Sequence, residues 1–376
     1  MPWKEVSTMS LREEFVLLSR QPDVNMARLC KRFGISRKTG YKWRDRYRPG
    51  DGGTLQDQSR RPRQSPSRTQ KSIQLAAVKL RVKHGWGGRK IHHRLVALGH
   101  QEIPAVSTIS TILKRHGLID PKQSGQHQPF KRFERQQPNE LWQMDFKGHF
   151  EIATGRCHPL TVLDDHSRYS ITLRACQNEK STTVQHALST AFRRYGLPQQ
   201  MLMDNGAPWG SDAEHVFTPL TLWLIRLGIH VSHGRPYHPQ TQGKEERFHR
   251  TLNVELIQRR WFTDLPHCQR HFDRWRDIYN LERPHEALDM QVPAQRYRCS
   301  ARAFPELLPS IEYGTDNQVR NVQANGYLHF KGRLFRVAKS LRGYPVALHA
   351  TQIDSRFDVF FCHQKITTID LEAPHA

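Results

Sequence analysis

Acidic residues are scarce in this chain of 376 residues: 35 Asp and Glu stand against 58 Lys and Arg, which leaves a formal net charge of +23. The six cysteines include no Cys-x-x-Cys pair, so we expect neither a disulfide framework nor a zinc site. The chain lacks apolar runs near the ~20 residues needed to cross a bilayer, and it lacks a glycine-rich Walker loop. These absences argue against a membrane protein and an ATPase, and the surplus of cations favours a polyanionic partner.

The positive charge is concentrated in the N-terminal third. Residues 1–140 hold 29 Lys and Arg against 11 Asp and Glu, whereas residues 141–376 hold 29 against 24. We therefore expect the N-terminal third to anchor the chain electrostatically on its partner. The length predicts roughly two to four domains, and the first residues lead into no apolar segment typical of a signal peptide.

Residues 1–48 carry the pattern of a helix-turn-helix DNA-binding domain. Residues 26–33 predict a helix, Gly34 gives a turn, and Ser36 is suited to cap a basic helix over residues 37–47. An ordinary pair of solvated basic helices is the alternative, but charge and turn chemistry both favour DNA binding. The side chains that we expect to contact DNA are Arg37, Lys38, Lys42 and Arg44.

Residues 69–120 predict a second helical domain, all-α like the first. Helices are expected near residues 69–84, 89–98 and 107–116, with Ser107 as the cap of the third. Three short helices with a basic last one resemble a homeodomain-like fold. The expected DNA contacts are Lys114 and Arg115.

Two polar, basic linkers flank this second domain, at residues 49–68 and 121–140. The first contains Arg60, Arg61 and Arg63 among Ser and Pro residues. It would either follow DNA phosphates or act as a spacer, and the sequence leaves both open.

Residues 141–262 change to a mixed pattern of strands and helices. Strands in series, followed by alternating helix and strand, predict an α/β layer fold, and a helical extension over residues 263–310 follows. The expected strands are 141–146, 160–164, 169–175, 199–204 and 229–233, and the expected helices are 181–195, 217–227, 243–261 and 266–281.

Residues 311–372 alternate with a period of two and predict a small C-terminal β-barrel. Residues 327–330 and 334–337 form a hairpin pattern around Gly332, and further short strands are expected at residues 346–348, 358–362 and 366–369.

Three carboxylates in the α/β segment are candidates for a metal site. Asp145 lies within a predicted strand, Asp204 at the end of another, and Glu246 in the first turns of a long helix. Cleavage of a phosphodiester is served by two metal ions ~3.5–4 Å apart, and Mg²⁺ prefers carboxylate oxygens. Any one of the three taken alone is more typical of a surface charge. Without a cation, their mutual repulsion would destabilise the site.

The contexts of these carboxylates resemble the DDE transposases of bacterial insertion sequences. The resemblance rests on Trp-Gln-Met-Asp at residues 142–145, Asp-Asn-Gly at 204–206 and the segment 236–252 with its Gly-Lys-Glu-Glu-Arg-Phe. That family has an RNase H-like catalytic core similar to the core of retroviral integrases. The resemblance implies Asp145, Asp204 and Glu246 as the catalytic triad, which would bind two Mg²⁺ or Mn²⁺ ions.

Two features depart from the family pattern. The gap between Asp204 and Glu246 is about six residues longer than usual, with the extra residues near 208–219, where a loop should tolerate them. In addition, Glu245 stands where an apolar residue is commoner. Helical geometry places Glu245 on the face of Phe248, and Glu246 on a different stripe. The motif register favours Glu246, and Glu245 remains a rival.

Other polar residues of this region have secondary expected roles. We expect Asp164 and Asp165 to shape a turn rather than bind metal, while His238 and His249 are candidates to assist near the scissile phosphate. The side chains expected to contact DNA phosphates or backbone are Lys244, Arg247, Arg250 and Asn253.

The resemblance therefore implies a multidomain enzyme: helix-turn-helix domains, an RNase H-like core and a small SH3-like β-barrel. It would nick the 3′ end of a mobile element and join the freed 3′-OH to target DNA. Its partners would be duplex DNA of the terminal inverted repeats and the target, bound as a homodimer or higher oligomer in the bacterial cytoplasm, at the nucleoid. A catalytically inactive DNA-binding regulator and a nuclease without joining activity are the alternatives.

Overall fold

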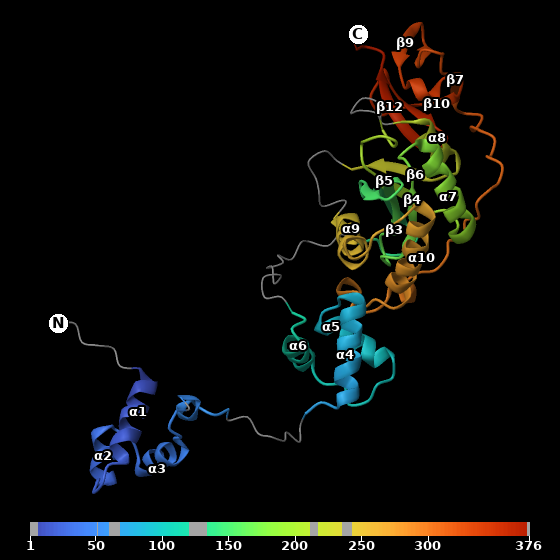
Figure 1. The fold of residues 1–376 in the computed structure, drawn as a ribbon. Coiled ribbons are helices and arrows are strands. Elements are labelled where there is room, and N and C mark those ends of the chain that lie inside the picture. The colour runs from blue at the N-terminus through green and yellow to red at the C-terminus, as the bar shows by residue number, and fades with distance from the viewer. Residues whose placement is uncertain are drawn as a thin grey trace. The chain divides into compact units, whose positions relative to one another are not determined.

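The computed structural model describes residues 7–50, 52–59, 68–119, 134–210, 217–234 and 243–373. The chain divides into two compact units, residues 1–68 and residues 69–376 (Figure 1). Within the described residues, no helix combines the length and the apolar character needed to cross a membrane. The expected site residues Arg60, Arg61, Arg63 and His238 lie outside the described ranges.

The first unit is a small helical domain with its own core. Phe15, Val16, Cys30 and Trp43 are buried in it. The Ser36 side chain accepts a hydrogen bond from the backbone N–H of Thr39, which confirms the predicted cap. The first helix is not predicted by the sequence analysis. The elements are α1 (Thr8–Ser19), α2 (Met26–Arg32), α3 (Arg37–Arg46) and η1 (Gly52–Leu55).

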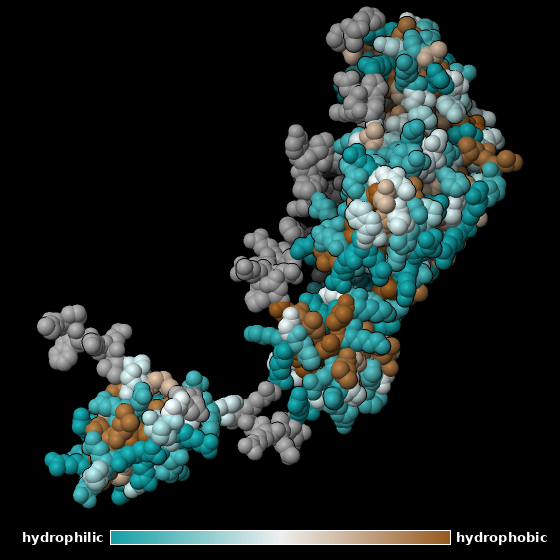
Figure 2. All heavy atoms as spheres, viewed as in Figure 1, coloured by the Kyte–Doolittle hydropathy of each residue, from teal (hydrophilic) through white to brown (hydrophobic). Residues whose placement is uncertain are grey.

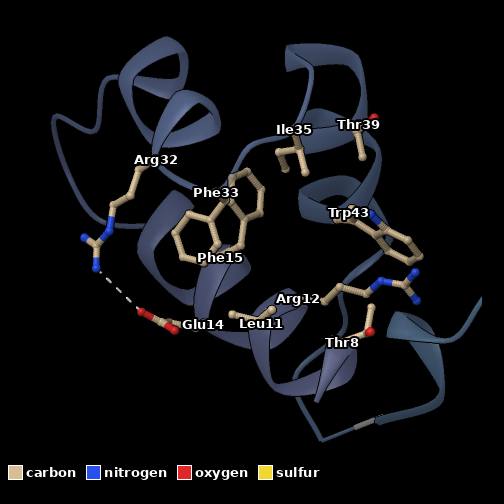
Figure 3. A pocket seen from close by; sticks show the side chains of 10 residues that line it. All are labelled: Thr8, Leu11, Arg12, Glu14, Phe15, Arg32, Phe33, Ile35, Thr39 and Trp43. Carbon is tan, nitrogen blue, oxygen red and sulfur yellow. Dashed lines mark ion pairs between the residues drawn. The ribbon is translucent and has the colours of Figure 1, made fainter. Parts of the chain in front are cut away.

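A groove with a volume of about 570 Å³ opens on this unit (Figure 3). The ring of Phe15 meets that of Phe33 edge to face, with 5.4 Å between centroids. The guanidinium of Arg12 lies 4.0 Å from the centroid of the Trp43 ring. The first contact holds α1 against the end of α2 and the second holds it against α3, so that α3 can present its basic side chains on a fixed support.

The second unit begins with three helices around a core that includes Ile73, Ile91 and Ile109. The three predicted helices are confirmed, but the predicted cap at Ser107 is wrong. Helix α6 starts at Val106, so Ser107 already lies in its first turn, and Ala105 at the cap position makes no side-chain cap bond. The helices are α4 (Lys71–His84), α5 (Gly88–Ala97) and α6 (Val106–Arg115).

These three helices contact the segment that contains residues 278–282 of the same unit. Ile278 packs against their core, and the guanidinium of Arg94 pairs with Glu282 at 2.7 Å. Apolar side chains also remain on their surface (Figure 2), where Leu75 and Val82 of α4 are 58% and 64% exposed.

A six-stranded sheet forms the centre of the second unit, with strand order β2-β3-β1-β5-β6 and β4 paired with β3. β1 runs antiparallel to β3 and parallel to β5. The mixed α/β pattern is confirmed, and the short edge strand β2 is an addition. The strands are β1 (Leu141–Phe146), β2 (Phe150–Ile152), β3 (Gly155–Asp164), β4 (Ser170–Cys176), β5 (Gln200–Met203) and β6 (His230–His233).

Helices cover both faces of this sheet (Figure 1). Trp142 and Met144 of β1 pack with α7 (Ser181–Tyr195) and α8 (Pro219–Arg226) in one cluster. Leu163 and Leu173 point the other way and pack with α9 and α10. Strand alternation therefore places Asp145 on the side of the sheet that α9 covers.

The predicted helix over residues 243–261 is too long. α9 (Gly243–Glu255) ends before Leu256, whose φ of −129° and ψ of −61° leave the helix. Leu256 and Phe262 are both buried in the α9–α10 cluster. Six residues apart on one helix, they would project about 120° apart, so the chain must break to bury both. The next elements are η4 (Ile257–Arg259), α10 (Leu265–Leu281), η5 (Glu286–Leu288) and α11 (Pro293–Arg296).

The C-terminal residues form antiparallel sheets, as the period-two pattern predicts. β7, β10, β11 and β12 make a four-stranded sheet, and β8 and β9 make the predicted hairpin. Gln364 joins this region to the core through hydrogen bonds with the backbone of Val231 at 3.1 and 3.3 Å. The elements are β7 (Gln318–Asn321), β8 (Tyr327–Phe330), β9 (Arg333–Arg336), η6 (Lys339–Leu341), β10 (Pro345–Ala350), β11 (Arg356–Phe361) and β12 (Gln364–Asp370).

Candidate active site

Asp145 projects from β1 opposite Thr161 of β3. Its side chain is about one quarter exposed. Burial, together with the negative charges of Asp204, Glu179 and Glu246, raises the pKa of Asp145 to about 7, although a hydrogen bond from the Phe146 backbone acts in the opposite direction. A carboxyl whose pKa is raised by burial and by neighbouring carboxylates is a candidate for a cation-binding site.

Asp204 follows β5, the parallel neighbour of β1, and thus lies at the carboxyl end of a strand. One carboxylate oxygen accepts a hydrogen bond from the Gly206 N–H at 3.1 Å. The ring of His233, at the end of β6, lies 2.8 Å from the Asp204 carbonyl oxygen. Burial raises the pKa of Asp204 despite these contacts.

Glu246 is exposed in the first turn of α9. Its charge is among the influences that raise the pKa of Asp145. The structure thus brings the three sequence-predicted carboxylates into one neighbourhood, from β1, the end of β5 and the start of α9.

Glu179 is a fourth carboxylate that the sequence analysis missed. It lies between β4 and α7 and raises the pKa of both Asp145 and Asp204. One of its oxygens is 2.8 Å from Nδ1 of His158 on β3. No motif surrounds it, and only the pairing of β3 with β4, which sets His158 opposite Cys176, brings it to the site.

Glu245 is buried, at 1% exposure, on the apolar face of α9 with Phe248 and Leu252. The prediction from helical geometry that Glu245 and Glu246 lie on different faces of α9 is therefore confirmed. Burial, followed by the charge of Asp145, raises the pKa of Glu245 well above its ordinary value. Its Oε1 has no hydrogen-bond partner, which is the arrangement of a neutral carboxyl rather than of an ionised one.

Thr161 links Glu245 to Asp145 and His249. Its hydroxyl oxygen lies 3.0 Å from Glu245 Oε2, 3.0 Å from the Asp145 carbonyl oxygen and 2.8 Å from His249 Nε2. Burial lowers the pKa of His249 to about 4, so its ring is neutral. The Thr161 hydroxyl has a single proton, which it can donate to Glu245 Oε2 or to the Asp145 carbonyl oxygen, and it accepts from His249 when Nε2 carries the ring proton.

Lys244 anchors the start of α9. Its ammonium pairs with the buried carboxylate of Asp165, which also accepts hydrogen bonds from the Arg135 N–H at 2.8 Å and the Gln143 amide at 2.7 Å. Burial lowers the pKa of Lys244 to about 8. The ammonium is thus engaged inside the protein in this structure, away from the phosphate contact that the sequence predicts.

Asp164 and Asp165 shape the β3–β4 turn, as predicted. Asp164 accepts hydrogen bonds from the Ser167 N–H and hydroxyl at 2.8 and 2.5 Å and from the Asn139 N–H at 2.7 Å. Protein donors thus engage the carboxylate oxygens of both residues.

The donor set at Asp145, Asp204 and Glu246 consists of carboxylate oxygens, which fits Mg²⁺ or Mn²⁺ and not a thiophilic metal. Among the residues that the structure describes, no three such side chains already surround a common metal position. Without a cation, mutual repulsion favours separation of the carboxylates of Asp145, Asp204 and Glu246, in line with the raised pKa of Asp145.

The expected DNA-binding side chains lie on exposed helix surfaces, with a few exceptions. Lys114 and Arg115 are exposed at the end of α6, and Arg247 and Arg250 on α9. Arg44 and Asn253 are partly buried. Those exposed on α3 are Arg37, Lys38 and Lys42.

Comparison with known families places the domains. Residues 135–239 and 227–293 match two descriptions of the integrase core domain. Residues 317–376 match the C-terminal domain of IS481 family transposases. The chain is thus similar to insertion-sequence transposases that carry an integrase core. Homeodomain-like domains match residues 7–55 and 39–113.

Relatives of this chain include proteins of two insertion elements. A 31.7 kDa protein of IS407 from Burkholderia multivorans is 29% identical over 177 residues, 46% of this chain and 62% of the relative. A 39.2 kDa protein of IS476 from Xanthomonas euvesicatoria is 26% identical over 235 residues, 61% of this chain and 66% of the relative. The matched part thus spans less than two thirds of each relative.

Solved structures give weaker similarities. A chain of the simian T-cell lymphotropic virus intasome in complex with PP2A regulatory subunit B56 gamma has a TM-score of 0.37 and 18% identity, over 78% of this chain and 99% of that chain. The HTLV-2 integrase catalytic core in complex with magnesium has a TM-score of 0.32 and 18% identity, over 43% of this chain and 97% of that chain.

Proposed function

We propose that this chain is a DNA transposase, a polynucleotidyl transferase that nicks the 3′ end of its element and joins that end to target DNA. The observation that carries the proposal is that Asp145 on β1, Asp204 just after the parallel strand β5 and Glu246 at the start of α9 lie in one neighbourhood. Their setting in a chain of net charge +23, with helix-turn-helix domains ahead of them, supports nucleic acid as the substrate.

Asp145, Asp204 and Glu246 would hold two Mg²⁺ or Mn²⁺ ions. When bound, such ions activate an attacking oxygen and stabilise a leaving oxygen at phosphorus. In the first reaction, a water oxygen forms the new bond to phosphorus, and the 3′-oxygen of the element leaves as a hydroxyl. In the second, that hydroxyl attacks a target phosphodiester, and a target 3′-hydroxyl leaves. Both are in-line displacements that need no nucleophile from the protein.

The chain's own residues would position the DNA. The basic faces of α3 and α6 would bind the terminal repeats, with Arg60, Arg61 and Arg63 of the linker along the phosphates. Arg247, Arg250 and Asn253 would contact the backbone beside the carboxylates. Lys244 would join them only after leaving Asp165.

The proposed organisation follows the predicted boundaries. It assigns residues 1–48 and 69–120 to DNA binding, 141–262 to an RNase H-like core, and 311–372 to an SH3-like barrel. We propose a homodimer or higher oligomer on paired element ends, acting in the bacterial cytoplasm at the nucleoid.

A strand-transfer assay tests the proposal. It uses a labelled duplex ending in the terminal repeat that flanks the coding sequence, a target plasmid, and Mg²⁺ or Mn²⁺. We expect joined product from the wild-type chain and from the control Asp316→Asn, which removes an exposed carboxylate of the C-terminal region, and none from Asp204→Asn. Cutting without joining would identify a nuclease. Binding without either reaction would identify an inactive regulator, and product from Asp204→Asn would remove the metal assignment.

A further inference from the structure

A cluster of cationic side chains surrounds His271 on α10. Burial lowers the pKa of His271, and the charges of four neighbouring side chains lower it further. These neighbours are Arg260, His267, Arg270 and Arg274. The three arginines are exposed. The two histidines lie one helical turn apart, with 3.0 Å between their Nε2 atoms. We call Arg260, Arg270 and Arg274 the α10 basic cluster.

The fold does not use these three guanidiniums. None of them makes an ion pair or a side-chain hydrogen bond with any residue in the described part of the chain. Arg276 on the same helix differs, because it donates to the Ile171 carbonyl oxygen at 3.0 Å. Bringing like charges together costs free energy, and an external anion bound to the α10 basic cluster would offset that cost.

Nearby carboxylates are mostly engaged elsewhere. Asp264 caps α10 by accepting from the His267 N–H at 2.7 Å and also accepts from the Thr263 hydroxyl at 3.1 Å. Asp273 accepts from the Gln269 amide at 2.9 Å. Asp277 is exposed one turn beyond Arg274, where it serves as an internal control below.

An exposed aromatic ring adjoins the cluster. Trp261 follows Arg260 directly and is 70% exposed, whereas its neighbour Phe262 is buried. Guanidiniums beside an exposed aromatic side chain are the composition of nucleic-acid surfaces. A single-strand platform stacks successive bases on several rings, so one tryptophan among three arginines favours a duplex backbone.

The spacing also suits a duplex and separates the cluster from the carboxylates. Arg270 and Arg274 are four residues apart on α10, which separates them by about 6 Å along the helix axis. This distance is close to the rise over two phosphate steps of one DNA strand, which is about 6.8 Å. α9 carries the chain roughly 13 Å from Glu246 to Glu255, and η4 follows before Arg260. DNA held at Arg260 would therefore lie several base pairs from the reacting phosphate.

We propose that the α10 basic cluster is a second DNA surface, which holds the backbone of duplex target DNA, with Trp261 at its edge. The identification of the anion as DNA rests on the proposed function. The surface adds to that function a means of fixing the target away from the site of chemistry.

The test is the salt dependence of binding by the full-length chain to a duplex without terminal repeats. Replacing all three arginines together, Arg260→Gln, Arg270→Gln and Arg274→Gln, keeps long polar side chains and removes only charge. The slope of log K against log salt should fall in magnitude by about 2.7, since each phosphate contact contributes about 0.9. Asp277→Asn, on the same helix, should tighten binding. An unchanged slope in the triple variant, with an unchanged melting temperature, would overturn the proposal.

Trp261→Ala identifies the occupant. A larger loss of affinity for a single-stranded oligonucleotide than for the duplex would overturn the duplex assignment. Because binding needs no catalysis, the two proposals fail separately. A reduced salt slope in the triple variant, together with no strand transfer by the wild type, would support the DNA surface and contradict the transposase activity. Strand transfer by the wild type, together with an unchanged slope in the triple variant, would support the transposase activity and contradict the DNA surface.

Discussion

Replacing Asp145 with asparagine is expected to stabilise the metal-free protein at pH 8, although it should destroy catalysis. The folded protein raises the pKa of Asp145 from 3.8 to about 7, first through burial and then through Asp204 and its acidic neighbours. An acid with a raised folded pKa makes the folded state more stable below pH 4. That advantage is lost as the pH rises through about 7, where the folded state must carry the charge.

The magnitude follows from the two pKa values. A difference of about three corresponds to about 4 kcal/mol, at about 1.36 kcal/mol per pKa unit. This figure is an upper bound, because the side chain of Asp145 remains about one quarter exposed. Asparagine has nearly the same shape and no charge, so it should recover a large part of this free energy at pH 8 and little at pH 4.

Urea unfolding in the presence of a chelator, at pH 8 and pH 4, measures the effect. The free energy of unfolding of Asp145→Asn should exceed that of the wild type by roughly 2–4 kcal/mol at pH 8, with near equality at pH 4. Asp316→Asn, which removes an exposed carboxylate, should change neither value. Equal stabilities of wild type and Asp145→Asn at pH 8 would refute the electrostatic account of the site.

Three further outcomes are expected. Glu255→Ala should cost about 3–5 kcal/mol in urea unfolding, because it leaves buried Arg283, now 3.0 Å from that carboxylate, without its partner; a loss below 1 kcal/mol would contradict the pair's structural role. Thr161→Val removes the hydroxyl shared by Glu245, His249 and the Asp145 carbonyl. It should lower the free energy of unfolding by about 1–3 kcal/mol, which thermal melting measures, and an unchanged melting temperature would argue against the network. Lys42→Ala on α3 should reduce the salt slope of terminal-repeat binding by about 1, and an unchanged slope would remove Lys42 from the interface.

Local rules in the sequence predict those features that one element decides by itself. Ser36 caps α3 because its side chain reaches the Thr39 N–H, and helical periodicity alone separates Glu245 from Glu246. β1 is predicted with its observed bounds, because its alternation directs Trp142 and Met144 toward one core.

Features that depend on tertiary contacts escape such rules. α9 ends early because Leu256 and Phe262 are both buried against α10, which no local pattern reveals. Glu179 reaches the site through the register of β3 and β4. Lys244 forms an ion pair with the buried carboxylate of Asp165. From the sequence alone, Lys244 resembles any exposed lysine beside a DNA-binding motif.

Strand transfer by Glu246→Gln and Glu245→Gln, assayed side by side in Mg²⁺ and in Mn²⁺, tests the central claim most directly. Glutamine at position 246 removes the charge of a proposed metal ligand in an exposed turn, so we expect no joined product. Glutamine at position 245 replaces a buried carboxyl whose pKa burial raises well above its ordinary value, so product should persist near the wild-type amount. Joined product from Glu246→Gln, or its loss in Glu245→Gln alone with folding intact, would contradict the assignment of Asp145, Asp204 and Glu246 as the metal-binding triad.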